Sequence, residues 1–353
     1  MRDFLVFVFL VLLVLSLVVM GVVYYQIHFA HPAMRGPAGS GPVEVEFEVQ
    51  TGESTADIAR HLADQGLIRY PSLFQLWARL RRMDGRLEAG RYILRSDMTM
   101  DQILERLTHA PEKDEVSFTI IEGLRLEEVA ASLEKQGVVA ADEFLAAVQQ
   151  PYDCGFLAER PVGASLEGYL FPDTYLVLRT VTATQIVDLM LANFDQRFTP
   201  EMRQKARERG LTIHEVVTLA SIVEKEAILD KERPIIAGVY LNRLAAEMPL
   251  QSCPTVQYAL GYDEASGRWW RELNFDQLGV TNLSEIDHPY NTYLYLGLPP
   301  GPISNPGLAS LQAVLEPAQT DYYYFVAKND GSNEHAFART LEEHNANIAR
   351  YQR

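Results

Sequence analysis

Residues 220–228 read Ala-Ser-Ile-Val-Glu-Lys-Glu-Ala-Ile, and they place two carboxylates and one ammonium in a segment with the pattern of a buried helix. Burying a charge is costly unless a partner or a function compensates for the lost solvation. Buried ionisable groups with shifted pKa values also gather at functional sites. We therefore look for chemistry first at the two glutamates of this stretch, Glu224 and Glu226.

The helical wheel distinguishes the two glutamates only mildly. Glu226 follows Val223, Ile222 and Leu219 by three, four and seven residues, so large apolar side chains surround it. Desolvation of this kind raises the pKa of a carboxyl group and keeps a proton available near neutral pH, as a general acid needs. Glu224 is also next to apolar positions. In the alternative interpretation, both glutamates lie at a helix end and pair with nearby basic residues: Lys225, Lys231 or Arg233.

The N-terminal end of the chain indicates where this chemistry takes place. Residues 4–25 carry no charge and are rich in Leu, Val and Phe. At 1.5 Å per residue they span about 33 Å, enough to cross a bilayer, and Tyr24 and Tyr25 lie where an interfacial aromatic belt is expected. We predict a transmembrane helix after a cytoplasmic tail, residues 1–3, with the rest of the chain extracytoplasmic. A cleaved signal peptide is the alternative.

Composition narrows the classes of ligand. The formal net charge is −16 and there is no basic run, which argues against a nucleic-acid partner. His288, His335 and His344 show no metal-ligand spacing, so we expect no metal and no cofactor. We expect Cys154 and Cys253 to be buried thiols that are not joined by a disulfide bond. In an oxidising compartment they could pair.

A repeated unit follows a linker rich in Pro and Gly, residues 26–42. Alternating apolar and acidic residues predict a strand over 43–49, followed by a glycine turn and a short helix. The same pattern returns at an offset of 71 residues, which we interpret as a duplicated strand-turn-helix module. The copies lie in residues 43–108 and 116–180. Alternatively, any strand-glycine-helix unit would look similar.

The rest of the chain, residues 181–353, is predicted to be mostly helical and to form a separate domain. Residues 322–327 and 335–337 are expected to form a hairpin near its end. The fold class that these patterns predict is α+β, with a single N-terminal transmembrane helix.

Two polar segments of this region could contact a carbohydrate. Gln251 and Thr255 join a polar loop to an apolar helix, and they could hydrogen-bond a sugar or merely cap the helix. Asn291 and Tyr293 belong to a tyrosine-rich stretch that runs into a Pro/Gly loop. Aromatic faces with amide donors suit sugar rings, but such tyrosines are as often packing residues.

These segments together resemble one family. The blocks EGYLFPDTY from Glu167, ASIVEKEA from Ala220, MPLQSCPTVQYALG from Met248 and PYNTYLYLGLPPGPISNPG from Pro289 occur in the order found in the membrane-anchored endolytic murein transglycosylases of the MltG (YceG-like) family. The resemblance implies a single-pass protein of the bacterial inner membrane with a periplasmic C-terminal part. It also implies a LysM-like subdomain over 43–108 and a lysozyme-like transglycosylase domain over 181–353.

The resemblance assigns roles to individual residues. It maps the catalytic acid to Glu226 and places Gln251 near the sugar. The full set of residues that we expect to bind substrate is Glu167, Gln251, Thr255, Asn291 and Tyr293. Two positions depart from the family pattern. Cys253 stands where relatives often carry Asp, and Ala227 stands where Ser or Thr is common.

The family reaction needs one carboxyl group. The acid protonates the oxygen of the β-1,4 bond between MurNAc and GlcNAc, and its carboxylate then takes the proton of the MurNAc C6 hydroxyl as a 1,6-anhydro ring closes. The implied partners are peptidoglycan glycan strands, the inner membrane and cell-wall synthases (penicillin-binding proteins), with a role in ending glycan strand elongation. A lysozyme-type muramidase, which uses water, and a non-catalytic peptidoglycan-binding scaffold are the alternatives.

Overall fold

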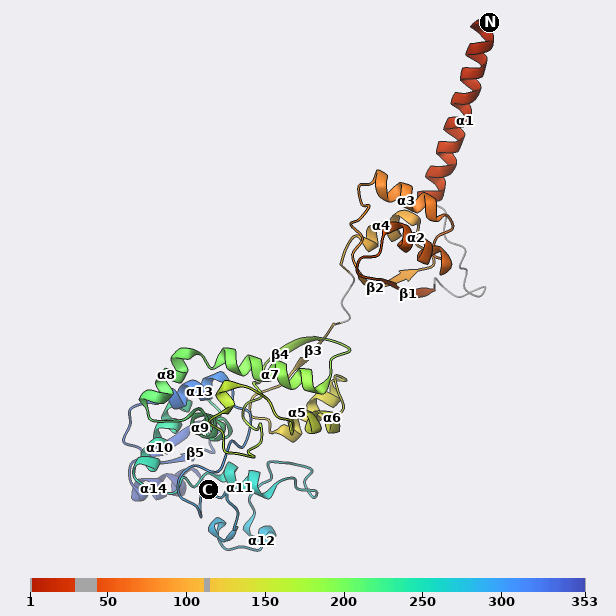
Figure 1. Ribbon diagram of the computed structural model, residues 1–353. Coiled ribbons are helices and arrows are strands. Elements are labelled where there is room, and N and C mark those ends of the chain that lie inside the picture. The colour runs from red at the N-terminus through yellow and green to blue at the C-terminus, as the bar shows by residue number, and fades with distance from the viewer. Residues whose placement is uncertain (1, 29–42, 111–114, 353) are drawn as a thin grey trace. The chain divides into compact units, whose positions relative to one another are not determined.

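The computed structural model describes residues 2–28, 43–110 and 115–352 (Figure 1). The chain divides into two compact units, an N-terminal unit, Met1–Asp114, and a C-terminal unit, Glu115–Arg353. Most of the predicted linker, residues 29–42, lies outside the described residues. Helices and two-stranded antiparallel sheets make up both units, so the fold class is α+β.

The N-terminal unit packs its helices against one small sheet. Its elements are α1 (Arg2–His28), β1 (Glu44–Val49), α2 (Thr55–Asp64), α3 (Pro71–Leu80), β2 (Gly90–Arg95) and α4 (Met100–Leu107). β1 pairs antiparallel with β2, from Glu44 opposite Arg95 to Val49 opposite Gly90. Phe47 and Val49 of β1 are buried while the glutamates of the strand face outward, as the alternation predicts.

The apolar helix α1 begins and ends close to the limits predicted from the sequence. Phe7–His28 is long and apolar enough to cross a bilayer, and its apolar core is not buried by the rest of the described chain. An apolar helix of this length at this position is consistent with a membrane anchor. A signal sequence of the same length and apolar composition is equally consistent with this helix.

The second strand-turn-helix module opens the C-terminal unit. It comprises β3 (Glu115–Thr119), α5 (Leu126–Lys135), α6 (Ala141–Ala147), η1 (Gly155–Leu157) and β4 (Thr174–Leu178), and β3 pairs antiparallel with β4. The matched glycines of the two modules have the same left-handed backbone: φ is 83° at Gly52 and 77° at Gly123, and 71° at Gly66 and 70° at Gly137. Both modules therefore turn at the same places.

A mostly helical region completes this unit. Its elements are α7 (Ala183–Arg197), α8 (Pro200–Glu208), α9 (Ile213–Glu226), η2 (Asp230–Glu232), α10 (Arg233–Ala245), α11 (Cys253–Leu260), α12 (Phe275–Leu278), η3 (Leu283–Glu285), α13 (Leu308–Leu315), β5 (Tyr324–Ala327), β6 (His335–Ala338) and α14 (Leu341–Tyr351). The predicted hairpin forms as the antiparallel pair β5 and β6. α9 packs against α10, α11 and α13 at the centre of the region.

One hydrophobic core joins this region to the second module. Phe118 and Tyr175 of the module belong to the same cluster of buried residues as Ile222 and Val223 of α9. Residues 116–180 and 181–353, which the sequence analysis treats as separate parts, therefore share a core.

Candidate active site

Glu226 is the last residue of a helix that is buried along most of its length. Thr212 caps α9 in a capping box with Glu215, and the residues from Val216 to Val223 are buried. At Ala227 the backbone becomes extended, with ψ at 123°, and the helix ends. The Glu226 side chain is half-buried, so the core helix presents a carboxyl group at an accessible end.

Two hydroxyl groups orient the Glu226 carboxyl. Tyr240 of α10 donates to Oε1 at 2.8 Å, and Ser252 donates to the same oxygen at 2.7 Å. Tyr240 and Ser252 are themselves buried. In the described chain, Oε1 accepts both of the hydrogen bonds made to this carboxyl group. Oε2 is therefore the oxygen left for a substrate. With Oε1 accepting twice, a proton on Glu226 resides on Oε2.

The environment of Glu226 favours that proton. Burial raises the pKa of Glu226 above the ordinary carboxyl value of 4.5, although the hydrogen bonds from Ser252 and Tyr240 act in the opposite direction. A carboxyl group with a raised pKa and one accessible oxygen has the properties of a general acid.

Glu224 has a different set of contacts. Its Oε1 lies 3.0 Å from Nη1 of Arg233, and both side chains are almost fully buried. Its Oε2 accepts hydrogen bonds from the backbone N–H of Gly307 at 3.1 Å and from Ser310 at 2.8 Å. Glu224 thus forms an ion pair with Arg233, as the alternative interpretation of the two glutamates predicted. These contacts join α9, α10 and α13.

The loop between α10 and α11 carries Ser252 to the carboxyl group. Arg243 holds the loop by donating to the carbonyl oxygens of Pro249 at 3.0 Å and Leu250 at 2.9 Å. Gln251 is exposed and has a φ of 52°, a left-handed conformation that is uncommon for a residue with a side chain. This backbone turn places exposed Gln251 directly beside Ser252.

Thr255 and Asn291 are buried and hydrogen-bond within the protein. Thr255 donates to the carbonyl of Ser252 at 2.7 Å and lies 2.9 Å from the hydroxyl of Thr292. Asn291 donates to the carbonyls of Leu283 and Ile286, both at 2.7 Å. Their amide and hydroxyl groups hold the loops around the site rather than point toward a sugar.

Tyr293 and Cys253 lie together at the edge of the site. The Tyr293 hydroxyl and the Cys253 sulfur are 3.1 Å apart, and burial, together with the charges of Cys253 and Glu226, raises the pKa of Tyr293. Both cysteines are free thiols, as expected, but Cys253 is exposed and Cys154 is half-buried. The expectation of buried thiols is thus corrected for Cys253, because it begins α11 at the open side of the site.

Glu167 lies inside the core rather than on a binding surface. Its Oε2 accepts from the backbone N–H of Leu126 at 3.2 Å, and its Oε1 accepts from the Asn305 amide at 3.2 Å. Burial raises the pKa of Glu167 to about 8. This carboxyl group joins the second module to the loop before α13.

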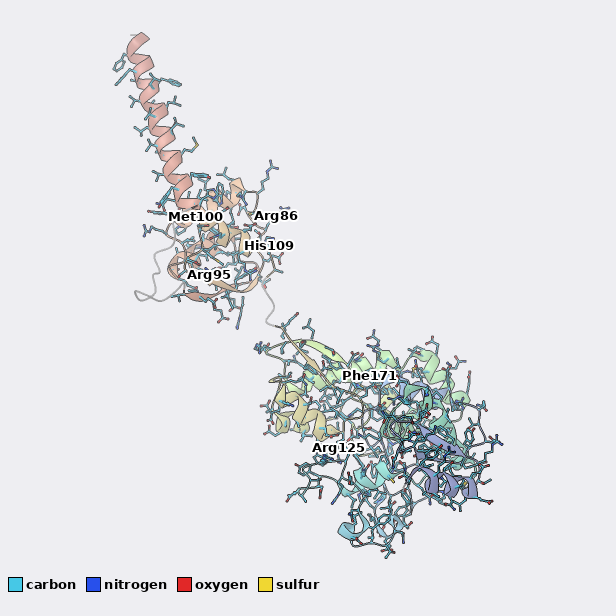
Figure 2. The ribbon with its side chains drawn as sticks, turned by 180° about the vertical axis from the view of Figure 1, so that it is seen from behind. Arg86, Arg95, Met100, His109, Arg125 and Phe171 are labelled. Carbon is cyan, nitrogen blue, oxygen red and sulfur yellow. The ribbon has the colours of Figure 1, made fainter. Side chains whose placement is uncertain are left out.

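Aromatic and basic side chains cover the neighbouring surface. The Arg125 guanidinium, labelled in Figure 2, lies 4.4 Å from the ring centre of Tyr258 and 4.2 Å from that of Trp269. Lys225, between the two glutamates in sequence, lies 3.8 Å from the ring centre of Trp270. These cation–π contacts attach α11 to the second module, and the loop after α11 to the second module and to α9.

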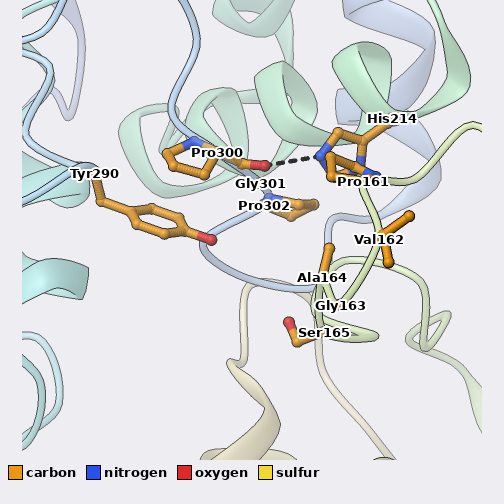
Figure 3. Close-up of a pocket in the computed structure, with 10 residues that line it drawn as sticks. All are labelled: Pro161, Val162, Gly163, Ala164, Ser165, His214, Tyr290, Pro300, Gly301 and Pro302. Atoms are coloured by element: carbon orange, nitrogen blue, oxygen red, sulfur yellow. Dashed lines mark hydrogen bonds between the residues drawn. The ribbon is translucent and has the colours of Figure 1, made fainter.

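A separate cavity of about 250 Å³ lies beside Tyr290 (Figure 3). His214 lies at its edge, where its Nε2 donates to the carbonyl of Pro300 at 3.0 Å and its Nδ1 accepts from Tyr169 at 2.9 Å. Both ring nitrogens are therefore used within the fold. The cavity contains none of the predicted site residues, and we assign no chemistry to it.

Sequence reasoning missed Tyr240 and did not assign Ser252 a role. Tyr240 stands two residues before Asn242 in the middle of an apolar helix, and nothing in that pattern separates it from a packing tyrosine. Ser252 stands in the quoted loop, but its contact with Glu226 depends on the turn at Gln251. In the described part of the chain no group of three or more His, Cys, Asp or Glu is arranged to hold a metal ion.

The fold and the site define an α+β protein with one carboxylic acid at the end of a core helix, oriented by two hydroxyl groups. A model of the YceG-like family matches residues 47–350. The chain belongs to this family.

Two similar relatives are named endolytic murein transglycosylase. The Bacillus subtilis protein is 32% identical over 319 residues, which cover 87% of this chain and 84% of the relative. The Streptococcus pneumoniae serotype 2 protein is 31% identical over 330 residues, which cover 87% of this chain and 58% of the relative. The crystal structure of a YceG-like protein from Listeria monocytogenes superposes on this chain with a TM-score of 0.56 and 32% sequence identity. The alignment covers 86% of this chain and 98% of the Listeria chain.

Proposed function

We propose that this chain is an endolytic murein transglycosylase in which Glu226 is the general acid and, in turn, the general base. The observation that carries the proposal is the asymmetric environment of the Glu226 carboxyl, with two donors on Oε1 and Oε2 left accessible. The relatives that share the family and most of the chain carry the name of this activity.

The mechanism follows from the two oxygens. Protonated Oε2 donates to the oxygen of the bond between MurNAc and GlcNAc, and the glycosidic bond breaks. The resulting carboxylate accepts the proton of the MurNAc C6 hydroxyl while that oxygen attacks the anomeric carbon. Tyr240 and Ser252 stabilise the negative charge on Oε1 between the two steps. No water is consumed, and the product carries a 1,6-anhydro end.

The neighbouring acids favour this reaction over hydrolysis by a pair of carboxylates. Glu224 is bound to Arg233 and Ser310, and the Glu232 carboxylate is 2.7 Å from Nδ1 of His335. Neither is available to activate a water or attack the sugar, as a two-carboxylate glycosidase requires. Exposed Gln251 is the proposed sugar contact, with Tyr293 beside it, while Thr255, Asn291 and Glu167 support the loops.

The finer parts of the proposal concern location. We propose that α1 anchors the protein in the inner membrane as a single span, that residues 43–108 are a LysM-like subdomain that binds glycan, and that the C-terminal unit is periplasmic. Cell-wall synthases are proposed partners on the basis of the family resemblance.

The test is digestion of purified sacculi by the full-length protein, with the fragments analysed by mass spectrometry. Glu226→Gln keeps volume and hydrogen bonding but removes the transferable proton. We expect formation of anhydro ends to fall by about 10²–10⁴-fold while binding to sacculi persists.

Glu215→Gln is the matched control, because it makes the same change at the other end of α9 and glutamine also serves in a capping box. It should leave the rate nearly unchanged. Glu224→Gln should affect the rate much less than Glu226→Gln and should mainly lower stability. Free MurNAc ends in place of anhydro ends would indicate a muramidase, and binding of wild-type protein without release of fragments would indicate a scaffold.

A further inference from the structure

Positive charge is concentrated in one short segment of the N-terminal unit. The segment 69–86 has a formal charge of +4, within a chain whose net charge is −16. It contains one aspartate and five arginines: Arg69, Arg79, Arg81, Arg82 and Arg86. The outward-facing glutamates of β1 lie on the sheet instead. Figure 2 shows Arg86 level with Met100, at the end of the unit near α1, and Arg95 on the sheet side. On the sheet these glutamates are balanced by arginines, with Arg91 3.5 Å from Glu46, so the surplus of positive charge lies in the segment 69–86.

Helix α3, within this segment, also exposes large apolar side chains. Phe74 and Ala78 face the core of the unit and are fully buried. On the outer side, Leu76 is 51% and Leu80 is 66% exposed. Exposed leucines between arginines are typical of helices that lie in a membrane interface.

The contacts of α1 fix the height of α3 relative to the end of the apolar span. Ile27 is buried in the hydrophobic core of the unit, and the His28 ring lies 5.3 Å from the ring of Trp77 in α3. His28 is three residues beyond Tyr25, where the uncharged stretch ends, and three residues of helix rise about 4.5 Å. The headgroup layer is about 5–7 Å thick. Trp77, in the second half of α3, thus lies within the depth of the headgroups.

We infer that α3 and the surrounding arginines dock on the surface of the membrane that α1 spans, with the leucines in the interface and the arginines against anionic phospholipid headgroups. This inference rests on the anchoring role of α1 given under the proposed function. Charge complementarity selects this occupant, because a second copy docked symmetrically through the same surface would oppose these arginines with its own. The sheet of β1 and β2 then faces away from the membrane.

The experiment uses the full-length protein, one copy per lipid nanodisc, with brominated acyl chains that quench tryptophan fluorescence. Leu80→Trp places the probe on α3, and Ile93→Trp is the matched control on β2, where Ile93 is 59% exposed. The signal of the parent chain, from Trp77, Trp269 and Trp270, is subtracted. In discs with anionic lipid we expect quenching at position 80 to exceed that at position 93 several-fold.

Charge reversal separates lipid recognition from simple proximity. Arg69 and Arg86 make no ion pair with any residue in the described ranges, so Arg69→Glu with Arg86→Glu alters charge without breaking an ion pair among them. In the Leu80→Trp chain this change, or replacement of the anionic lipid by a zwitterionic one, should reduce quenching at position 80. The same reversal at Arg91 and Arg95 of β2 should leave quenching unchanged.

Equal quenching at positions 80 and 93, or equal effects of the two charge reversals, would overturn the inference. The tryptophan at position 80 could instead be quenched only weakly in discs with one copy and become protected from solvent when a disc holds two copies. The surface would then be a protein contact, and the inference would be wrong. Failure of the protein to remain in the discs would refute the anchoring by α1 and this inference with it. Sacculus digestion tests the catalytic proposal independently.

Discussion

At the scale of single residues, the site depends on which oxygen of Glu226 receives hydrogen bonds. A carboxyl group in an apolar pocket is an acid with a raised pKa, but its proton could reside on either oxygen. Tyr240 and Ser252 both donate to Oε1 and so direct the proton to Oε2. Their hydrogen bonds also lower the pKa of Glu226 against the effect of burial. Orientation and acidity are therefore linked.

Replacing Tyr240 by Phe is expected to separate these two effects. Without the phenol donor the pKa of Glu226 rises further, so the loss of activity at high pH, where the acid is deprotonated, moves to higher pH. The maximum rate falls because the proton is no longer directed to Oε2. The measurement is kcat/KM for release of anhydro fragments as a function of pH.

Tyr293→Phe is the control, because the Tyr293 hydroxyl contacts Cys253 rather than the carboxyl group. It should leave the position of the high-pH limb unchanged. A limb that moves to lower pH in Tyr240→Phe would contradict the assignment of Tyr240 as a donor to Glu226.

At the scale of elements, three sequence blocks meet on α9. Ser221 of the helix accepts a hydrogen bond from the backbone N–H of Ile303 at 3.0 Å. Asn305 accepts at its side-chain oxygen from the backbone N–H groups of Gly168 and Leu170, both at 3.0 Å. The segment after Glu167, helix α9 and the loop before α13 thus form one unit that holds the end of α9 in place.

At Gly168 these blocks pack closely together, which leads to a prediction about stability. Its φ is 87°, and an added Cβ would lie 2.5 Å from Pro302 and 2.8 Å from Val217. Gly168→Ala should therefore lower the free energy of unfolding by about 1–3 kcal/mol for overpacking, in addition to the cost of the left-handed backbone. Urea denaturation measures the change.

Gly163→Ala is the matched control, because its φ is 79° but nothing lies within 4 Å of an added Cβ. Its free energy of unfolding should fall only by the cost of placing an alanine in a left-handed backbone conformation. Equal destabilisation by the two variants would mean that close packing at Gly168 contributes nothing.

At the scale of the whole molecule, two separate hydrophobic cores predict two unfolding transitions. One cluster of buried residues lies in the N-terminal unit and the other in the C-terminal unit. Each unit therefore has the means to unfold cooperatively on its own. Glu167 is buried in the C-terminal unit and has a raised pKa, so it provides a way to tell the two transitions apart.

The C-terminal transition should depend on pH through Glu167. Its pKa is about 8 in the folded state, against an ordinary carboxyl value of 4.5, so the folded state binds more protons between these values. Stability is greatest below the lower value and falls as pH rises to about 8, by at most about 1.4 kcal/mol per pH unit. Glu167→Gln should flatten this dependence in the C-terminal transition alone. Thermal unfolding from pH 5 to pH 9 is the measurement, and an unchanged slope would refute the assignment.

Much of the local structure follows from the sequence pattern. The alternation in residues 43–49 predicted β1, the hairpin near the end formed, and the unbroken apolar run in residues 4–25 predicted α1 within a few residues. These successes share a cause, since helix and strand periodicity is a property of residues close in the chain. The mild preference for Glu226 from its neighbours on the wheel stays a prediction.

Tertiary contacts decided what the periodicity left open. Glu224 and Glu226 have similar neighbours in sequence, yet one received the guanidinium of Arg233 and the other two hydroxyl groups. Thr255 and Asn291 turned inward because their partners come from adjoining loops. By itself the sequence determined the apolar span, the local elements and the helix that carries both glutamates. Only the tertiary structure decided which carboxyl group pairs with a guanidinium and which is oriented by two hydroxyl groups, because these partners come from residues far away in the chain.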